Sequence, residues 1–237
     1  MIPHLFKNLI SSILFLYIVI HLWLIVPQFQ IGNSFVANNI LENLIYESQE
    51  PTFSTKITPQ MLKNLSSRQL ETVSAAQTAN QALGSQLTNV SDFMTNLAMQ
   101  ESQLGKQVSP VSYSPFQIDP IWYEDIASKG QAGEKQTLKR ANIANELLKN
   151  MGYGENFDIL NLLLEKIRDP IIGSLLTRMK LGTIKESIPS DLEGQANYWK
   201  KYWNTKAGKG KPEHFINQVQ HYNKVLGIKT YDDTVLE

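Results

Sequence analysis

Several things are missing from this sequence of 237 residues, and each absence narrows what the protein can be. There is no cysteine, so disulfides and thiolate metal sites are excluded, and the absence fits an oxidising compartment. Neither sign of charge is in excess, because 22 basic residues balance 22 acidic ones, so nucleic acid is not an expected partner. The four histidines have no acidic partners at a ligand spacing, so we expect neither a metal nor a cofactor.

The longest apolar run covers residues 9–26, which is long enough to cross a membrane as a helix, since about 17 to 20 residues suffice. Lys7 precedes the run, and no Lys or Arg follows it until Lys56. This asymmetry predicts a cytoplasmic N-terminus and an exported body. We therefore predict a single-pass signal-anchor over residues 1–27 in the inner membrane. The alternative is a cleaved signal peptide with a cleavage site near residues 32–34.

The rest of the chain divides into a polar tether at residues 28–57, a helical domain at 58–228 and a tail at 229–237. Helix signals recur through the domain, and no segment alternates as a strand does, so the predicted fold class is all-α. Candidate helix starts are Thr58-Pro59, Ser91, Asp119-Pro120, Asp158, Asp169-Pro170, Ser190 and Pro212. The segment Ser190-Asp-Leu-Glu193 also has the form of a capping box.

Glu101 lies at the end of an apolar helical stripe, because Phe93 and Leu97 precede it at intervals of four residues. Apolar surroundings raise the pKa of a carboxyl, so that it keeps its proton near neutral pH and can act as a general acid. The spacing alone favours a solvated residue at a fraying helix end, and only the pattern that follows Glu101 reverses this preference.

The residues that follow Glu101 carry a more specific pattern. Ser102 comes next, Gly105 lies three residues further on, and residues 114–120 read Ser-Pro-Phe-Gln-Ile-Asp-Pro. This pattern resembles the soluble lytic transglycosylases and goose-type lysozymes, which cut the glycan strands of peptidoglycan. In that family a Glu-Ser-x-x-Gly motif is followed by Gly-Leu-Met-Gln-Ile-x-Pro. The chain departs from the second motif in three places, with Ser114 in place of its Gly, and Pro and Phe in place of its Leu and Met.

The resemblance implies roles for individual residues. Glu101 would be the catalytic acid, Gln117 would contact the glycan, and Phe116 would line the cleft. A third family feature, a turn followed by a helix with an early glycine, loosely matches residues 168–176. The fourth is Ala-Tyr-Asn-x-Gly, whose Tyr reaches toward the catalytic Glu. Aligning its Asn with Asn204 places Trp203 in the position of that Tyr.

An aromatic cluster surrounds that position, with Tyr198, Trp199, Tyr202 and Trp203 at helical spacing. Aromatic rings stack on the apolar faces of sugars, so we expect one pair to line a cleft and the other to be buried. The predicted substrate-binding residues are Ser102, Tyr113, Phe116, Gln117, Tyr198, Tyr202, Trp203 and Asn204. The segment also resembles, more weakly, phage-borne cell-wall enzymes.

The resemblance implies a lysozyme-like helical domain acting on peptidoglycan. Glycoside hydrolysis usually needs two carboxylates, but no second acid stands out near Glu101, because Asp119 is better explained as a helix cap. This favours the lytic transglycosylase reaction, in which one Glu acts as acid and base and a 1,6-anhydro sugar is formed. A lysozyme-type hydrolase and a non-catalytic glycan-binding or virion structural module are the alternatives. A role in a secretion or phage-entry assembly, with a virion membrane as the location, is compatible with each.

Overall fold

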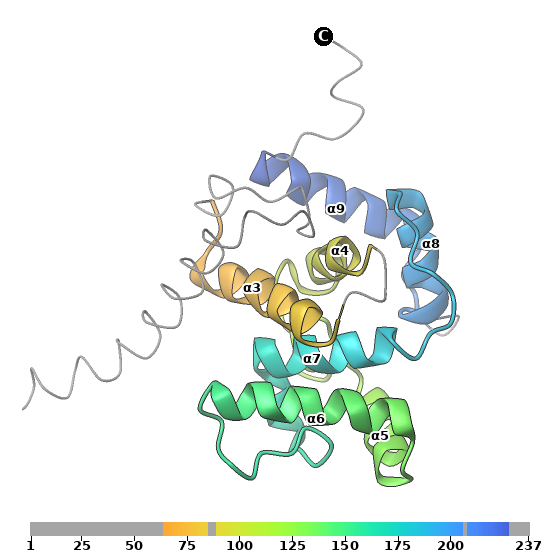
Figure 1. Ribbon diagram of the computed structural model, residues 1–237. Coiled ribbons are helices and arrows are strands. Elements are labelled where there is room, and N and C mark those ends of the chain that lie inside the picture. The colour runs from red at the N-terminus through yellow and green to blue at the C-terminus, as the bar shows by residue number, and fades with distance from the viewer. Residues whose placement is uncertain (1–63, 85–88, 206–207, 228–237) are drawn as a thin grey trace, which may run out of the picture. The chain divides into compact units, whose positions relative to one another are not determined.

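The computed structural model describes residues 64–84, 89–205 and 208–227. The chain divides into two units, Met1–Pro51 and Thr52–Glu237, and all the described residues belong to the second. They form helices and contain no strand, which confirms the predicted all-α class (Figure 1). No helix within these ranges is long and apolar enough to span a bilayer. The predicted anchor, tether and tail lie outside the described residues.

Three of the helices begin where the sequence predicts, at Pro120, Pro170 and Pro212. In chain order, the helices are α3 (Ser67–Ala82), α4 (Val90–Ser102), α5 (Pro120–Gln131), α6 (Lys135–Asn150), the 3-10 helix η1 (Leu164–Arg168), α7 (Pro170–Leu181), α8 (Leu192–Tyr202) and α9 (Pro212–Leu226). Helices α5, α7 and α9 start with a proline, which loses nothing there because the first N–H groups of a helix have no partner within it. The Asp119 and Asp169 side chains accept hydrogen bonds from main-chain N–H groups of α5 and α7.

Three other helix starts differ from the prediction. Helix α3 is capped by Ser66, which forms a capping box with Gln69, and Thr58-Pro59 lies outside the described residues. Helix α4 begins after Asn89, which adopts a left-handed conformation, so Ser91 falls inside the first turn. Helix α8 is capped by Asp191 instead of Ser190, since the Asp191 carboxylate accepts a hydrogen bond from the N–H of Gly194 at 2.7 Å.

The apolar segment after Asp158 does not form the predicted helix. Side chains satisfy its main-chain donors instead: Asn145 accepts from the N–H of Ile159 at 2.8 Å, and Asp158 accepts from the N–H of Leu160 at 3.0 Å. Ile159 and Leu160 are buried, so the segment fills the core as an irregular loop. Only η1, at its end, is helical.

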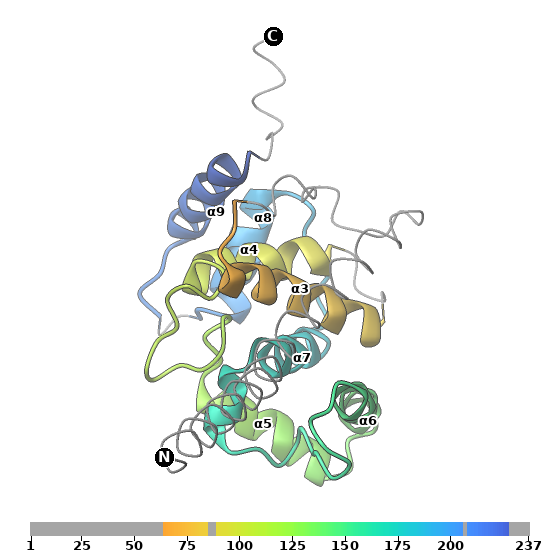
Figure 2. The ribbon, with the colours of Figure 1, turned by 90° about the vertical axis from the view of Figure 1, so that its left-hand side faces the viewer.

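Helices α4 and α7 form the centre of the domain, because both are buried around most of their circumference. Helix α4 packs against α3 and α9, and lies between them in Figure 1. Helix α7 packs against α3 on one side and against the α5–α6 pair on the other (Figure 2). Helix α8 packs against α9. Glu101 therefore lies in the last turn of a buried helix.

The connection between α4 and α5 contains a tight turn that fits against α7. Main-chain hydrogen bonds in both directions join Tyr113 to Ile118 and close the turn. Ser114 has a φ of 68°, a left-handed conformation that favours glycine. Its side chain faces Gly173 of α7, where an added Cβ would lie 2.3 Å from the Cβ of Ser114 and 3.2 Å from the carbonyl oxygen of Ile167. The absence of a side chain at Gly173 thus makes room for Ser114.

We predict that Gly173→Ala destabilises the domain by about 2 kcal/mol through this overlap. Ser114→Gly should restore most of the loss, because it removes the overlapping atom and relieves the left-handed strain. Ser114→Gly also removes the hydrogen bond that Ser114 Oγ accepts from the N–H of Phe116, so the recovery is not complete. A double-mutant cycle measured by urea unfolding should give a coupling energy of about 1 kcal/mol or more. Additive effects would show that the two positions do not constrain each other.

Candidate functional site

Glu101 lies where α4 ends in an unusual left-handed turn. Gln103, Leu104 and Gly105 follow with φ values of 54°, 59° and 84°. Such a conformation costs about 1 kcal/mol or more for each residue other than glycine. Two features support it, since Leu104 is fully buried and its N–H donates to the carbonyl of Ala98 at 2.8 Å. The chain thereby turns away from α4 directly after Glu101.

Gly105 has two reasons to be glycine. Its φ is positive, and an added Cβ would lie 2.4 Å from Oγ1 of Thr72 on α3.

The left-handed turn after Glu101 is also held to the neighbouring helices. Gln69 of α3 donates to the carbonyl of Gln103 at 3.2 Å, and Tyr222 of α9 donates to its side-chain oxygen at 3.2 Å. The turn after Glu101 is thus fixed from two sides.

Ser102 joins the end of α4 to the turn at residues 113–118. Its hydroxyl donates to the carbonyl of Pro115 and accepts from the N–H of Gly105 at 2.7 Å. The Ser102 side chain is buried, with 2% of its surface exposed. Its contacts are therefore internal ones that position the turn, and they differ from the predicted contact with substrate.

Gln117 completes the connection between the turn and α4. Its side-chain amide donates to the main-chain carbonyl of Glu101, one of the carbonyls that lack a partner at a helix C-terminus. Gln117 itself has a φ of 51°, so the turn holds it in a left-handed conformation. Its side chain is half-buried. The glutamine predicted from the motif is therefore directly beside Glu101.

Trp199 of α8 is the side-chain partner of the Glu101 carboxyl. Its indole N–H donates to Oε1 of Glu101 at 2.6 Å. The indole is 1% exposed and lies 5.5 Å from the ring of Phe215 on α9, measured between centroids. At its far edge it approaches Gly210, where an added Cβ would lie 2.5 Å from the ring. The indole is thus held between α9 and the 208–210 segment.

Burial raises the pKa of Glu101 from 4.5 to about 7. The hydrogen bond from Trp199 acts in the opposite direction, because a donor stabilises the carboxylate, but burial has the larger effect. The group is therefore divided between its acid and base forms near neutral pH. A carboxyl in this state can both give and take a proton, as general acid–base catalysis requires.

The predicted aromatic residues are more buried than expected. Phe116 is fully buried, so it belongs to the core and does not line a cleft. Trp203, 5% exposed, donates to the carbonyl of Phe116 at 3.1 Å and packs edge-on to Trp122. Both residues therefore stabilise the turn at residues 113–118, which contains Gln117.

The other predicted contacts lie apart from the carboxyl of Glu101. Tyr198 is 3% exposed, and its ring lies between those of Phe93 and Tyr202. Tyr202 donates to the exposed carboxylate of Glu186, and Asn204 accepts from Lys200 at 2.9 Å. The ring of Tyr113 lies 4.9 Å from the guanidinium of Arg168. None of these four residues forms a hydrogen bond with Glu101.

Trp199 is the residue that the motif alignment missed. Aligning the family's Asn with Asn204 favours Trp203, which lies one helical turn further along α8. Residues four apart share a helix face, so spacing alone does not distinguish the two tryptophans. The motif does not favour Trp199 in either alignment, because aligning its Ala with Ala196 places Asn197 in the position of the Tyr.

No family model, curated protein or solved structure matches this chain. In the described part of the chain, no group of three or more His, Cys, Asp or Glu side chains is placed to hold a metal ion. The site is thus defined by its own geometry: the carboxyl of Glu101 accepts a hydrogen bond from the indole of Trp199, and the main-chain carbonyl of Glu101 accepts one from Gln117.

We predict that Glu101 makes the protein less stable as the pH rises. Below pH 4.5 the carboxyl is protonated in the folded and unfolded chain alike, but between 4.5 and about 7 only the folded chain keeps the proton. Stability is therefore lost across that window, by about 3 kcal/mol at about 1.4 kcal/mol for each pKa unit. Glu101→Gln should remove this loss. In urea unfolding, its stability relative to wild type should rise from pH 4 to pH 8, and a constant difference would contradict the burial of Glu101.

We predict that Trp199→Phe raises the pKa of Glu101 further, because burial remains while the donor that stabilises the carboxylate is lost. Trp203→Phe is the matched control, since that indole is also buried but donates to a main-chain carbonyl. NMR titration of the Glu101 side-chain carbon would measure both variants. Equal pKa values in the two variants would show that the Trp199 hydrogen bond is not specific to Glu101.

Proposed function

We propose that this protein is a membrane-anchored peptidoglycan lytic transglycosylase with a lysozyme-like domain and Glu101 as its catalytic residue. One observation carries the proposal: Glu101 is half-buried, the loss of water around its carboxyl raises its pKa to about 7, Trp199 donates to that carboxyl, and Gln117 donates to the main-chain carbonyl of the same residue. The Glu-Ser-x-x-Gly and Gln-Ile-x-Pro motifs supply the two segments that meet there. The comparisons with known proteins add nothing for or against it.

The proposed reaction needs one carboxyl in two protonation states. The Glu101 carboxyl donates its proton to the glycosidic oxygen as the bond from that oxygen to C1 of the muramoyl sugar breaks. The resulting carboxylate takes the proton of that sugar's C6 hydroxyl, whose oxygen bonds to C1 and closes the 1,6-anhydro ring. A pKa near the working pH suits both steps. Among the described residues, burial and not a neighbouring carboxylate accounts for the raised pKa of Glu101, which favours this reaction over a two-carboxylate hydrolysis.

Gln117 would contact the glycan. Its amide nitrogen donates to the main-chain carbonyl of Glu101, whereas its side-chain oxygen has no hydrogen-bond donor among the described residues. This half-buried amide can accept a hydrogen bond from a sugar hydroxyl or acetamido group. The turn at residues 113–118 would be fixed by Ser102, Phe116 and Trp203, which would therefore act indirectly.

The apolar run at residues 9–26 would anchor the chain in the inner membrane, with the catalytic domain in the periplasm. The charge asymmetry around this run supports that orientation. A chain of this kind would open the wall locally, as a secretion or phage-entry assembly requires.

We predict that Glu101→Gln abolishes the clearing of purified cell walls, because glutamine keeps the shape of the side chain but has no proton to give. Glu193→Gln is the matched control, since Glu193 is exposed and lies in the first turn of α8. Mass spectrometry of the wild-type digest should detect 1,6-anhydromuramoyl products.

Two outcomes of this experiment would reject the proposal in different ways. Products with reducing ends would replace the transglycosylase by a hydrolase with the same catalytic residue. An intact wall after treatment with the wild-type chain would favour a non-catalytic glycan-binding or virion structural module.

A further inference from the structure

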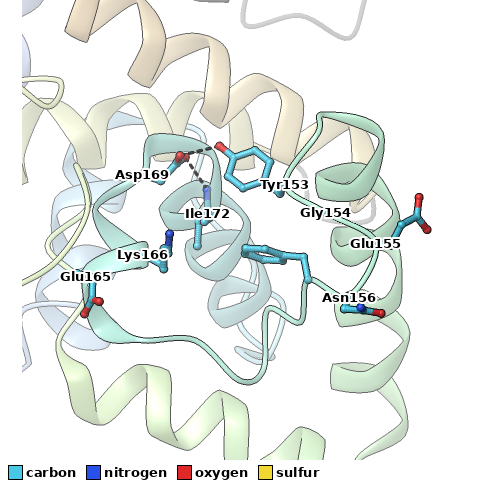
Figure 3. Close-up of a pocket in the computed structure, with 9 residues that line it drawn as sticks. Tyr153, Gly154, Glu155, Asn156, Glu165, Lys166, Asp169 and Ile172 are labelled. Carbon is cyan, nitrogen blue, oxygen red and sulfur yellow. Dashed lines mark hydrogen bonds between the residues drawn. The ribbon is translucent and has the colours of Figure 1, made fainter.

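A second candidate site lies in the connection between α6 and α7, on residues that do not contact Glu101. It is an open pocket of about 590 Å³ lined by Tyr153, Gly154, Glu155, Asn156, Phe157, Glu165, Lys166, Asp169 and Ile172 (Figure 3). The irregular segment after α6, the 3-10 helix η1 and the first turn of α7 contribute these residues. Of these residues, only Asp169 and Ile172 lie in a segment that the family motifs match.

An aromatic pair forms one wall of the pocket. The rings of Tyr153 and Phe157 lie 5.5 Å apart between centroids at an interplanar angle of 76°, and both residues are half-buried. The Tyr153 hydroxyl donates to the Asp169 carboxylate at 2.6 Å, as Figure 3 shows, so Tyr153 is fixed in place. Phe157 packs against the core but also lines the pocket and is only half-buried, so part of its ring is accessible to a flat apolar ligand surface.

One cation that lines the pocket, Lys166, is available to pair with a ligand. Asp169 already accepts from the Tyr153 hydroxyl and caps α7, and Glu155 pairs with Lys149 at 2.6 Å. The side chain of Glu165 points away from Lys166 and Ile172 in Figure 3. Lys166 is exposed and forms no ion pair within the described part of the chain. A ligand carboxylate would therefore find its partner at Lys166.

We propose that this pocket is an accessory binding site for an acidic aminosugar, a pyranose ring that stacks on Phe157 and directs a carboxylate to Lys166. Asn156, also on the lining, supplies an amide for the ring substituents. The choice of an aminosugar rests on the proposed function, because the acidic sugar of peptidoglycan carries a carboxylate-bearing lactyl group. The shape and charge of the pocket stand independently of it.

Arg168 connects the pocket to the segment that leads into the turn at residues 113–118. It lies between the pocket residues Lys166 and Asp169 in sequence, donates to the carbonyl of Pro110 at 3.0 Å and stacks on Tyr113. A polymer held at two places on one chain is retained more strongly than at either alone. The pocket would thus keep a long glycan strand on the enzyme while adding nothing to the cleavage of short fragments.

The test measures binding in the full chain carrying Glu101→Gln, so that no cleavage occurs. The probes are a GlcNAc–MurNAc disaccharide with a free lactyl carboxylate and the neutral disaccharide chitobiose, followed by NMR shifts of Phe157 and Lys166. Phe157→Ala, and Phe157→Leu, which keeps the apolar volume, should weaken binding of the acidic disaccharide about tenfold. Lys166→Gln should abolish the preference for the acidic disaccharide.

Leu163→Ala is the matched control, because Leu163 is exposed on the same connection but does not line the pocket. Binding that is unchanged in both Phe157 variants, or shifts confined to residues around Gln117, would overturn the inference. The absence of any binding by the parent chain would overturn it as well. Because the assay needs no catalysis, binding at the pocket combined with a wild-type chain that leaves cell walls intact would leave this inference standing and reject only the proposed function.

Discussion

The burial of one carboxyl against one indole is the constraint on which the rest of the domain depends. Glu101 is placed there by a helix that is buried around most of its circumference, and α4 supplies it, with Phe93, Met94 and Leu97 fully buried. The indole of Trp199 must stay in line with the carboxyl, so α8 and α9 pack around it. Burial and the hydrogen bond have opposite effects on the pKa, and the remaining difference keeps Glu101 near 7.

This arrangement stores backbone strain close to Glu101. Six residues other than glycine have positive φ in the described part of the chain, and four of them lie in the two segments that meet at its carbonyl, namely Gln103, Leu104, Ser114 and Gln117. Each left-handed residue costs free energy, and such residues persist only where their surroundings hold them. Here Ser102 bonds to both segments, and Tyr222 and Gln69 hold Gln103. The concentration of strain at one place is typical of functional sites.

Helix starts are the features that the sequence predicts best, because they depend on interactions between neighbouring residues. Asp119-Pro120 and Asp169-Pro170 begin helices as expected, because a cap and a proline act within one turn. The helix expected after Asp158 fails because Asn145, on another helix, takes up a main-chain donor of that segment. Phe116 and Trp203 are predicted to bind substrate but are buried beside the turn at residues 113–118. Trp199, which is not predicted to do so, donates to the carboxyl of Glu101. A helical period alone could not distinguish these outcomes, since the two tryptophans share a face.

The serine at position 114 adopts a backbone conformation that favours glycine, the residue of the motif at this position. The family's glycine is expected there because the chain needs a left-handed residue, and Ser114 adopts that conformation, with a φ of 68°. Its extra atoms need space, which Gly173 of α7 provides. Its hydroxyl also accepts a hydrogen bond from the N–H of Phe116, which a glycine could not do. The turn therefore brings Gln117 to Glu101 along a path that a glycine would also allow, and the substitution does not by itself argue against a catalytic role.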